Sequence, residues 1–263
     1  MHKLNILNIS TDCDNGAGLA AKEFNRFLKY SGYNSILLVK ESKYPNPEGI
    51  IVLEKTKRSK YSPIAFLRKL WMKIKFEFYL AKIGPLNPNY SFFNIDESVS
   101  DYSSKEILDR VPFKPDVIFI HWVSWFLNSR TIAELQHQTK ARVFMLMMDN
   151  APVTGGCHYT WDCKGFMTDC GNCPAILTDS KKDIARQNLQ LKRMNLPRNL
   201  ELITCSQSDY VKATKSSLYG HKQIYKLILP VDEKLFFPDK NRDLYKSKYG
   251  IDDSTDKIIL FGA

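Results

Sequence analysis

Several features that would assign a protein to a class at once are missing from this chain of 263 residues. It has no apolar run of the roughly 18 residues that a membrane-spanning helix needs. The short, interrupted apolar stretch after Met1-His2-Lys3 does not form a secretory signal. We therefore expect a cytoplasmic globular protein whose six cysteines lie in a reducing compartment, as metal ligands or buried thiols rather than disulfides.

Recognition elements for nucleic acid are missing as well. The chain has no zinc-finger spacing with paired histidines, no aromatic signature of an RNA-binding sheet and no clear helix-turn-helix. Its formal net charge of +10 still indicates an anionic partner, which is nucleic acid, an acidic membrane surface or a phosphorylated substrate. Charge alone does not choose among these partners. Without a recognition element, we expect no nucleic acid.

Short apolar runs alternate with amphipathic segments along most of the chain. The runs predict buried strands at residues 3–9, 35–39, 116–121, 142–148, 200–205 and 224–229. The segments between them predict helices at residues 19–28, 129–138, 181–194 and after Ser206. Strand–helix–strand units of this kind connect parallel strands. We predict an α/β fold, a Rossmann-like domain with a mostly parallel sheet and helices on both faces.

The stretch from Lys55 to Lys82 has almost no acidic residues, because Glu77 is its only acid. Within 62–83, apolar side chains share one stripe at helical spacing and basic side chains share another face, which predicts a basic amphipathic helix. Such a helix either packs on its own domain or docks on an anionic membrane surface. In the second case the protein would sit peripherally on the inner face of the cytoplasmic membrane.

The domain organisation follows from where this pattern changes. Residues 1–229 predict one Rossmann-like domain, with 149–180 as a Cys-rich loop insertion. Residues 230–263 predict a linker and the first strand of a second domain, since 257–261 is a fresh apolar run that stops at Gly262-Ala263. Natural domains seldom end on such a strand. We therefore expect a truncated chain.

A glycine turn, Asn15-Gly16-Ala17-Gly18, follows the first predicted strand and opens a helix. Backbone N–H groups at such a turn can approach an anion, and the helix N-terminus favours negative charge. The full dinucleotide fingerprint is absent, because Lys22 stands where a third glycine would be. The turn is therefore either an anion site or only a tight strand-to-helix connection.

Two polar residues close neighbouring strands at the predicted ligand edge of the sheet. His121 ends the strand at 116–121, where its near-neutral pKa suits a general base, or it bonds a neighbouring loop. Asp149 ends the next strand, where it either caps the loop or joins His121 to bind a sugar hydroxyl and accept its proton.

Four cysteines fall within the loop insertion: Cys157, Cys163, Cys170 and Cys173. Four thiolates suit a closed tetrahedral zinc site, which would hold together a loop with little core of its own. The second pair has the usual two-residue gap and the first pair has five, so unligated or oxidised thiols are the alternative. A thioredoxin-like redox pair is not expected, because Cys170 does not begin a helix after a strand. The chain indicates no redox cofactor.

The order of these motifs resembles a known family. A glycine turn after the first strand is followed by a strand ending in His-Trp, a strand ending in Asp, and then Thr-Gly-Gly-Cys-His-Tyr (154–159) and Cys-Gly-Asn-Cys-Pro (170–174). Nearly the whole chain is similar to a subgroup of glycosyltransferase family 4 from bacterial polysaccharide biosynthesis, which includes colanic-acid-type and capsule enzymes. The resemblance implies a GT-B fold, in which two Rossmann-like domains flank the active site.

The same resemblance implies a retaining transfer of sugar from a nucleotide-sugar to a glycan or lipid-linked acceptor. The N-terminal half would mainly bind the acceptor, and the donor phosphate would assist proton removal. Residues 16–18 (Gly16, Ala17 and Gly18) would face the donor diphosphate, and His121 and Asp149 would be catalytic. Residues beside these are expected to contact the acceptor: Asn15, Trp122 and Asn150.

The chain departs from that family at three places. Met148 stands where the subgroup usually has a histidine, and Pro230-Val231-Asp232 replaces Pro-Asn-Gly-Asp. The paired glutamates of the second domain would lie beyond residue 263. We therefore expect no transferase activity from this polypeptide alone. The alternative is a non-catalytic, zinc-stapled Rossmann-like module that binds a lipid or protein partner.

Overall fold

The structure is a computed structural model of the whole chain. It describes residues 3–44, 49–53, 70, 74, 77, 84–93, 96–177, 183–231, 233–234, 237 and 240–251. The chain divides into two compact units, Met1–Pro230 and Val231–Ala263. In the second unit the described residues form one short helix, α7 (Arg242–Lys248).

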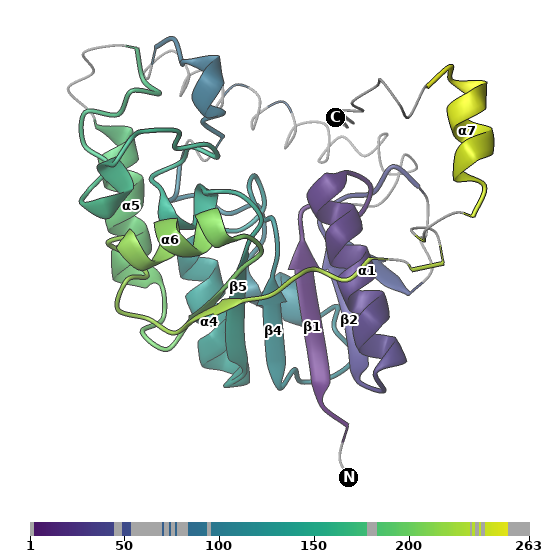
Figure 1. Cartoon of the computed structure of the whole chain (residues 1–263). Coiled ribbons are helices and arrows are strands. Elements are labelled where there is room, and N and C mark those ends of the chain that lie inside the picture. Colours follow the sequence, from purple (N-terminus) through teal and green to yellow (C-terminus); the bar gives the residue numbers. More distant parts are fainter. Residues whose placement is uncertain are drawn as a thin grey trace. The chain divides into compact units, whose positions relative to one another are not determined.

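A seven-stranded sheet forms the centre of the first unit, in the order β3-β2-β1-β4-β5-β6-β7 (Figure 1). Every neighbouring pair is parallel. Its strands are β1 (Asn5–Ser10), β2 (Asn34–Val39), β3 (Ile50–Val52), β4 (Val117–Ile120), β5 (Arg142–Met147), β6 (Glu201–Thr204) and β7 (Ile224–Lys226). The predicted Rossmann-like α/β class is confirmed.

The helices that follow these strands have the start signals of their sequences. They are α1 (Gly16–Tyr30), α3 (Ser104–Leu108), α4 (Ser129–Thr139), α5 (Ile184–Asn195) and α6 (Gln207–Lys215). Ser206 caps α6 as predicted, because its hydroxyl accepts a hydrogen bond from the Asp209 N–H at 3.0 Å. Asn128 and Asp183 cap α4 and α5 in the same way.

Alternation along the strands shows that both faces of the sheet are covered. In β1, Ile6 packs in a cluster with Phe24 and Leu28 of α1. Leu7 and Ile9, on the opposite face, belong to the main core cluster, which also holds buried residues of α4 and α5. α1 connects β1 to β2, and α4 connects β4 to β5, in the opposite direction across the sheet. Because both crossovers are right-handed, the two helices cover opposite faces of the sheet (Figure 1).

Three differences from the predicted elements have local causes. β3 and α3 were not predicted, because runs of three and five residues are too short for a periodic signal. A capping box marks α3 in hindsight, since Ser103 and Glu106 bond each other's backbone N–H. β7 ends at Lys226 instead of residue 229, and the chain continues as a segment without regular hydrogen bonding.

Two predicted segments lie largely or wholly outside the described residues. Of the predicted basic helix at 62–83, only Leu70, Ile74 and Glu77 are described, and these three are helical. The predicted strand at 257–261 is not described. Among the residues that are described, no helix has the length and apolar character to cross a membrane.

Candidate functional site

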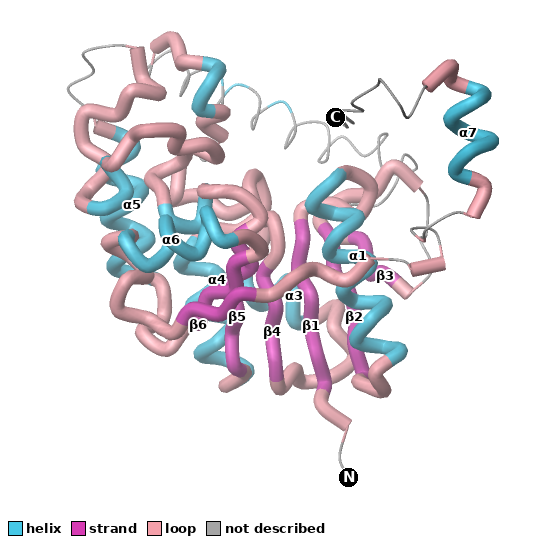
Figure 2. The backbone as a smooth tube through the Cα atoms, in the orientation of Figure 1, coloured by secondary structure: helices cyan, strands magenta, loops and turns pink. Residues whose placement is uncertain are grey.

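The strand order reverses direction between β1 and β4. From β1 the chain moves outward to β2 and β3, and from β4 it moves the other way to β5, β6 and β7. In open parallel sheets, ligands bind outside the carboxyl ends of the strands at such a switch point. Figure 2 shows the loops after β1, β4 and β5 together at this edge. The residues predicted for the site all come from these loops.

The glycine turn after β1 is shaped by Asp12. One carboxylate oxygen of Asp12 accepts the N–H groups of Asp14 and Asn15, both at 2.9 Å. α1 then begins without a side-chain cap and without an acidic residue in its first turn. The ammonium of Lys43 lies 3.0 Å from the Asn15 side-chain oxygen. An uncapped helix N-terminus beside a lysine can attract an anion.

The two glycines of the turn have different reasons to be glycine. A Cβ on Gly18 would lie 2.6 Å from the Asp12 carbonyl oxygen, so the turn itself needs Gly18. A Cβ on Gly16 would meet no atom within 4 Å. The fold therefore does not require glycine at position 16, and the space in front of it is open to a ligand.

His121 lies at the end of β4, but its ring is enclosed. Along β4, residues 117 and 119 pack with α1, and His121 continues this alternation onto the same face. Its ring packs edge-on against Phe24, with centroids 5.5 Å apart. Burial lowers the pKa of His121 to about 3, so the ring is neutral near pH 7. The catalytic role assigned to it stays a prediction.

The hydrogen bonds of Asn8 settle which ring nitrogen of His121 carries the proton. The Asn8 amide N–H₂ is occupied by Asn25 and Ser35, at 3.2 and 3.0 Å. Its oxygen lies 3.1 Å from His121 Nε2 and must accept, so Nε2 carries the proton. His121 Nδ1 then has a bare lone pair and no hydrogen-bond partner.

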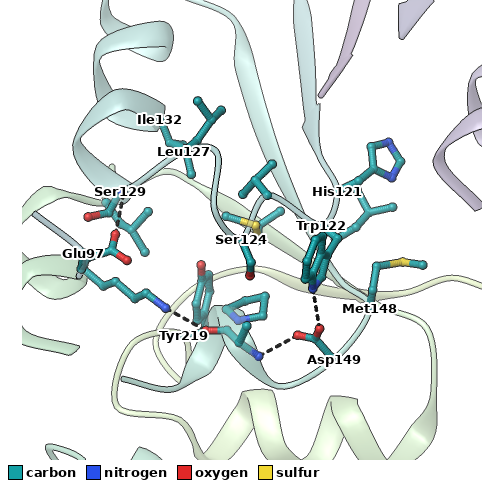
Figure 3. Close-up of a pocket in the computed structure, with 17 residues that line it drawn as sticks. Glu97, His121, Trp122, Ser124, Leu127, Ser129, Ile132, Met148, Asp149 and Tyr219 are labelled. Atoms are coloured by element: carbon teal, nitrogen blue, oxygen red, sulfur yellow. Dashed lines mark hydrogen bonds between the residues drawn. The ribbon is translucent and has the colours of Figure 1, made fainter. Parts of the chain in front are cut away.

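Asp149 follows β5 on the opposite face of the sheet from the His121 ring. Its carboxylate accepts hydrogen bonds from the Trp122 indole at 3.0 Å and the Ala151 N–H at 2.8 Å (Figure 3). His158 Nδ1 lies 2.6 Å from the same carboxylate. The structure therefore pairs Asp149 with His158, whereas the His121 ring points elsewhere.

Sequence reasoning did not assign a role to His158 or Ser124. His158 is buried in the Cys-rich loop, and its Nε2 lies 3.3 Å from the Ser124 hydroxyl. In the motif Thr-Gly-Gly-Cys-His-Tyr, the spacing of cysteines predicts a role for Cys157 and none for His158. A histidine in a loop beside a strand-end carboxylate was the available signal, but the contact between positions 149 and 158 depends on how the loop folds back.

The residues predicted to contact an acceptor are held in different ways. Asn150 is buried, and its oxygen accepts from Thr160 and from the Lys212 ammonium at 2.9 Å, which ties the loop to α6. The Trp122 indole N–H donates to Asp149, and part of the Trp122 side chain is exposed. Asn15 is exposed at the glycine turn. Their acceptor contacts stay predictions.

A cavity of about 50 Å³ lies beneath the loops that follow β4 and β5 (Figure 3). It has room for a few water-sized groups. Polar side chains around it include Glu97, Ser124, Asp149, Lys192 and Tyr219. Burial raises the pKa of Glu97 and of Tyr219. The Tyr219 hydroxyl is fully buried and has no hydrogen-bond partner.

The four loop cysteines are free thiols, two buried and two half-buried. Burial raises the pKa of Cys157 to about 12 and of Cys170 and Cys173 to about 11, and the thiols raise one another's pKa further. Backbone N–H groups donate to two of the sulfurs, from Gly155 to Cys170 and from Gly165 to Cys163, both at 3.4 Å.

These thiols are near one another without forming a metal-ligand arrangement. Within the described ranges, which include all four, no group of three or more His, Cys, Asp or Glu residues is placed to hold a metal ion. The thiols as placed do not fit a bound zinc ion. The predicted zinc site is therefore not confirmed.

Comparison with known proteins adds no assignment. No protein-family model matches the chain, and no curated protein matches it with significance.

Proposed function

We propose that this chain is the acceptor-side half of a retaining glycosyltransferase. The reaction would move a sugar from a nucleotide-sugar to a glycan or lipid-linked acceptor in bacterial surface-polysaccharide synthesis. The observation that carries the proposal is the uncapped glycine turn at the switch point of a parallel sheet, beside the Trp122 and Asp149 strand ends. The order of motifs that resembles glycosyltransferase family 4 supplies the reaction class.

The glycine turn would serve the donor diphosphate. Backbone N–H groups at the start of α1 are free of side-chain caps, and their partial positive charge favours a phosphate. Lys43 adds a full positive charge through its contact with Asn15. The open space before Gly16 allows the diphosphate to approach the backbone.

The acceptor would meet the loops after β4 and β5. Asp149 is the member of the predicted catalytic pair whose carboxylate borders the cavity. Its three N–H neighbours, from Trp122, Ala151 and His158, hold that carboxylate in one orientation. In this proposal His121 has a structural role, because its ring bonds Asn8 and packs against Phe24 in the middle of α1.

A zinc-stapled binding module without catalysis is the second candidate. The observation that favours it is the cluster of four free thiols in a loop whose described residues form only short 3₁₀ turns as regular helix or strand. In that case the glycine turn would be a structural connection, and the proteins that contain this domain would turn over no nucleotide-sugar.

The experiment uses a protein that extends this chain by a second domain, assayed for transfer from a panel of nucleotide-sugars. Gly16→Ala adds a methyl group to open space, so it should leave the unfolding midpoint unchanged. The same methyl group would obstruct the diphosphate, and we expect KM for the donor to rise roughly tenfold, about 1.4 kcal/mol.

Gly18→Ala is the matched control for the turn, because its Cβ would strike the Asp12 backbone and lower stability as well as binding. Absence of turnover with every nucleotide-sugar would refute the proposal and favour the binding module. A Gly16→Ala variant with an unaltered donor KM would remove the glycine turn from the donor site.

A further inference from the structure

A chain of hydrogen bonds joins Ser124, His158 and Asp149, and the proposed sugar transfer uses Asp149, with His158 orienting it, but gives Ser124 no role. The carboxylate of Asp149 lies 2.6 Å from His158 Nδ1. His158 Nε2 lies 3.3 Å from the Ser124 hydroxyl. The three residues come from the loop after β4, the end of β5 and the Cys-rich loop, so only the folded chain brings them together.

The acceptor capacity of Asp149 determines the direction of these bonds. A carboxylate can only accept, so the proton between the two groups belongs to His158 Nδ1. The Trp122 indole N–H donates to the same carboxylate oxygen at 3.0 Å and helps to hold it. Nε2 of the neutral ring is then a bare acceptor, and Ser124 donates its hydroxyl proton to it.

The backbone holds Ser124 firmly in this position. Its carbonyl accepts the Thr11 hydroxyl at 2.8 Å. The next residue, Trp125, has a φ of 64°, in the left-handed region that a bulky side chain rarely adopts. Its carbonyl accepts the Lys40 ammonium at 2.6 Å. Strain of this kind persists only where the surroundings impose it, and it gathers at functional sites.

Ser124 also borders the cavity described above, which offers a place for an acyl group and a donor for its carbonyl oxygen. Apolar side chains form much of its wall, among them Val123, Leu127 and Pro152. The Tyr219 hydroxyl borders the same cavity, buried and without a partner (Figure 3). A buried O–H without a partner can donate to a developing oxyanion and stabilise it.

We propose that Ser124, His158 and Asp149 form a nucleophilic relay that hydrolyses esters of acetyl-sized acyl groups. This activity goes beyond the proposed sugar transfer and does not rest on it. The cavity of about 50 Å³ sets the size of the acyl group, since it has room for only a few heavy atoms. The geometry follows the roles of serine, base and orienting carboxylate that define such relays.

The step proceeds through an acyl-enzyme. Ser124 Oγ attacks the ester carbonyl carbon as its proton passes to His158 Nε2, and the carbonyl oxygen takes a negative charge opposite the Tyr219 hydroxyl. The C–O bond to the alcohol breaks, and the alcohol leaves with the proton from His158. Water then attacks the acyl carbon as it gives a proton to His158 Nε2. The bond from the acyl carbon to Ser124 Oγ breaks, Oγ takes that proton back from His158, and the carboxylic acid leaves. Asp149 positions the imidazole throughout.

The first test is covalent labelling of the unaltered chain with a small alkyl fluorophosphonate, followed by peptide mapping. We expect one adduct per chain, on Ser124. Ser124→Ala should abolish the adduct, and Ser208→Ala, which alters an exposed serine of α6, should retain it. Because the mapping uses the unaltered chain, an adduct missing from Ser124 overturns the proposal without any question of misfolding.

The second test measures hydrolysis of p-nitrophenyl acetate and p-nitrophenyl octanoate. The acetate should be the better substrate by at least tenfold. Asp149→Asn should lower kcat roughly 10³-fold or more, since an amide favours the wrong imidazole tautomer. Tyr219→Phe, which keeps the ring, should lower it roughly 10²-fold. Equal rates for Ser124→Ala and the unaltered chain would overturn the proposal, whatever the outcome of the sugar-transfer assay.

Discussion

His121 shows at the residue scale how a strand's alternation decides what a side chain can do. The ring lies on the α1 face of the sheet, against Phe24 and Asn8. Burial lowers its pKa to about 3, against 6.5 for a free histidine. Between about pH 3 and 6.5, His121 is therefore protonated in the unfolded chain and neutral in the folded chain. Stability that is fully present above about pH 6.5 should be lost as the pH falls, at roughly 1.4 kcal/mol per unit.

We expect the free energy of unfolding to fall by roughly 2 kcal/mol more between pH 7.5 and 5.0 in the unaltered chain than in His121→Gln. Urea unfolding at the two pH values measures this difference. His137→Gln is the matched control, because His137 is exposed on α4 and should leave the dependence unchanged. Parallel pH profiles for the unaltered chain and His121→Gln would contradict the buried, neutral state of His121.

The two predicted catalytic residues show how far the sequence could lead at this scale. It placed His121 and Asp149 at strand ends correctly, because apolar runs mark where strands stop. The face of the sheet to which each side chain points depends on its position in the alternation along the strand. Val117, Phe119 and His121 alternate onto the face covered by α1. The partner of Asp149, His158, was not predictable, because the loop between them follows no periodic rule.

At the element scale, long periodic segments were predictable and short or irregular ones were not. The strands at β1, β2, β4, β5 and β6 and the helices α1, α4 and α5 follow from repeated burial, which leaves a clear pattern. The Cys-rich loop leaves none. Its residues are held by isolated bonds, for example the Thr154 hydroxyl to the Cys157 carbonyl and Lys192 to the Thr154 carbonyl. Such contacts have no local sequence signature.

The zinc proposal belongs to this loop. Backbone N–H groups donate to the sulfurs of Cys163 and Cys170, and the four thiols as placed are not arranged around one metal position. Zinc binding therefore requires the four sulfurs to converge to about 2.3 Å from one ion. The zinc-stapled module predicts about one zinc per chain by elemental mass spectrometry and its loss in Cys170→Ser with Cys173→Ser, whereas the thiols as placed predict none.

Cys13→Ser and Cys205→Ser are the controls for this measurement, since both thiols lie outside the loop and should leave the metal content unchanged. The loop's resistance to proteolysis should fall with the metal, because ligands tie together segments that share little core. A metal-free chain in which all four loop thiols react quickly with an alkylating agent would contradict a structural zinc site in this loop.

At the scale of the whole molecule, the hydrophobic core belongs to the first unit. Among the described residues, the buried hydrophobic side chains run from Ile6 to Tyr219, and the partly buried Leu229 packs against the cluster that contains Ile6 and Phe24. The described residues of the unit Val231–Ala263 contribute none of these buried side chains. We predict that burial of these side chains, all of which precede Pro230, supplies most of the free energy of folding of the first unit.

A chain that ends at Pro230 should thus fold with an unfolding midpoint within about 2 °C of the unaltered chain, since 1 kcal/mol shifts the midpoint of a domain this size by roughly 2–4 °C. Circular dichroism melting measures this. The matched control ends at Gln223 and removes β7, whose pairing with β6 covers that edge of the sheet, together with Leu229. We expect the control to melt several degrees lower, because it exposes the backbone of β6 and part of the α1 packing. Equal destabilisation of both shortened chains would mean that residues after Pro230 stabilise the first unit.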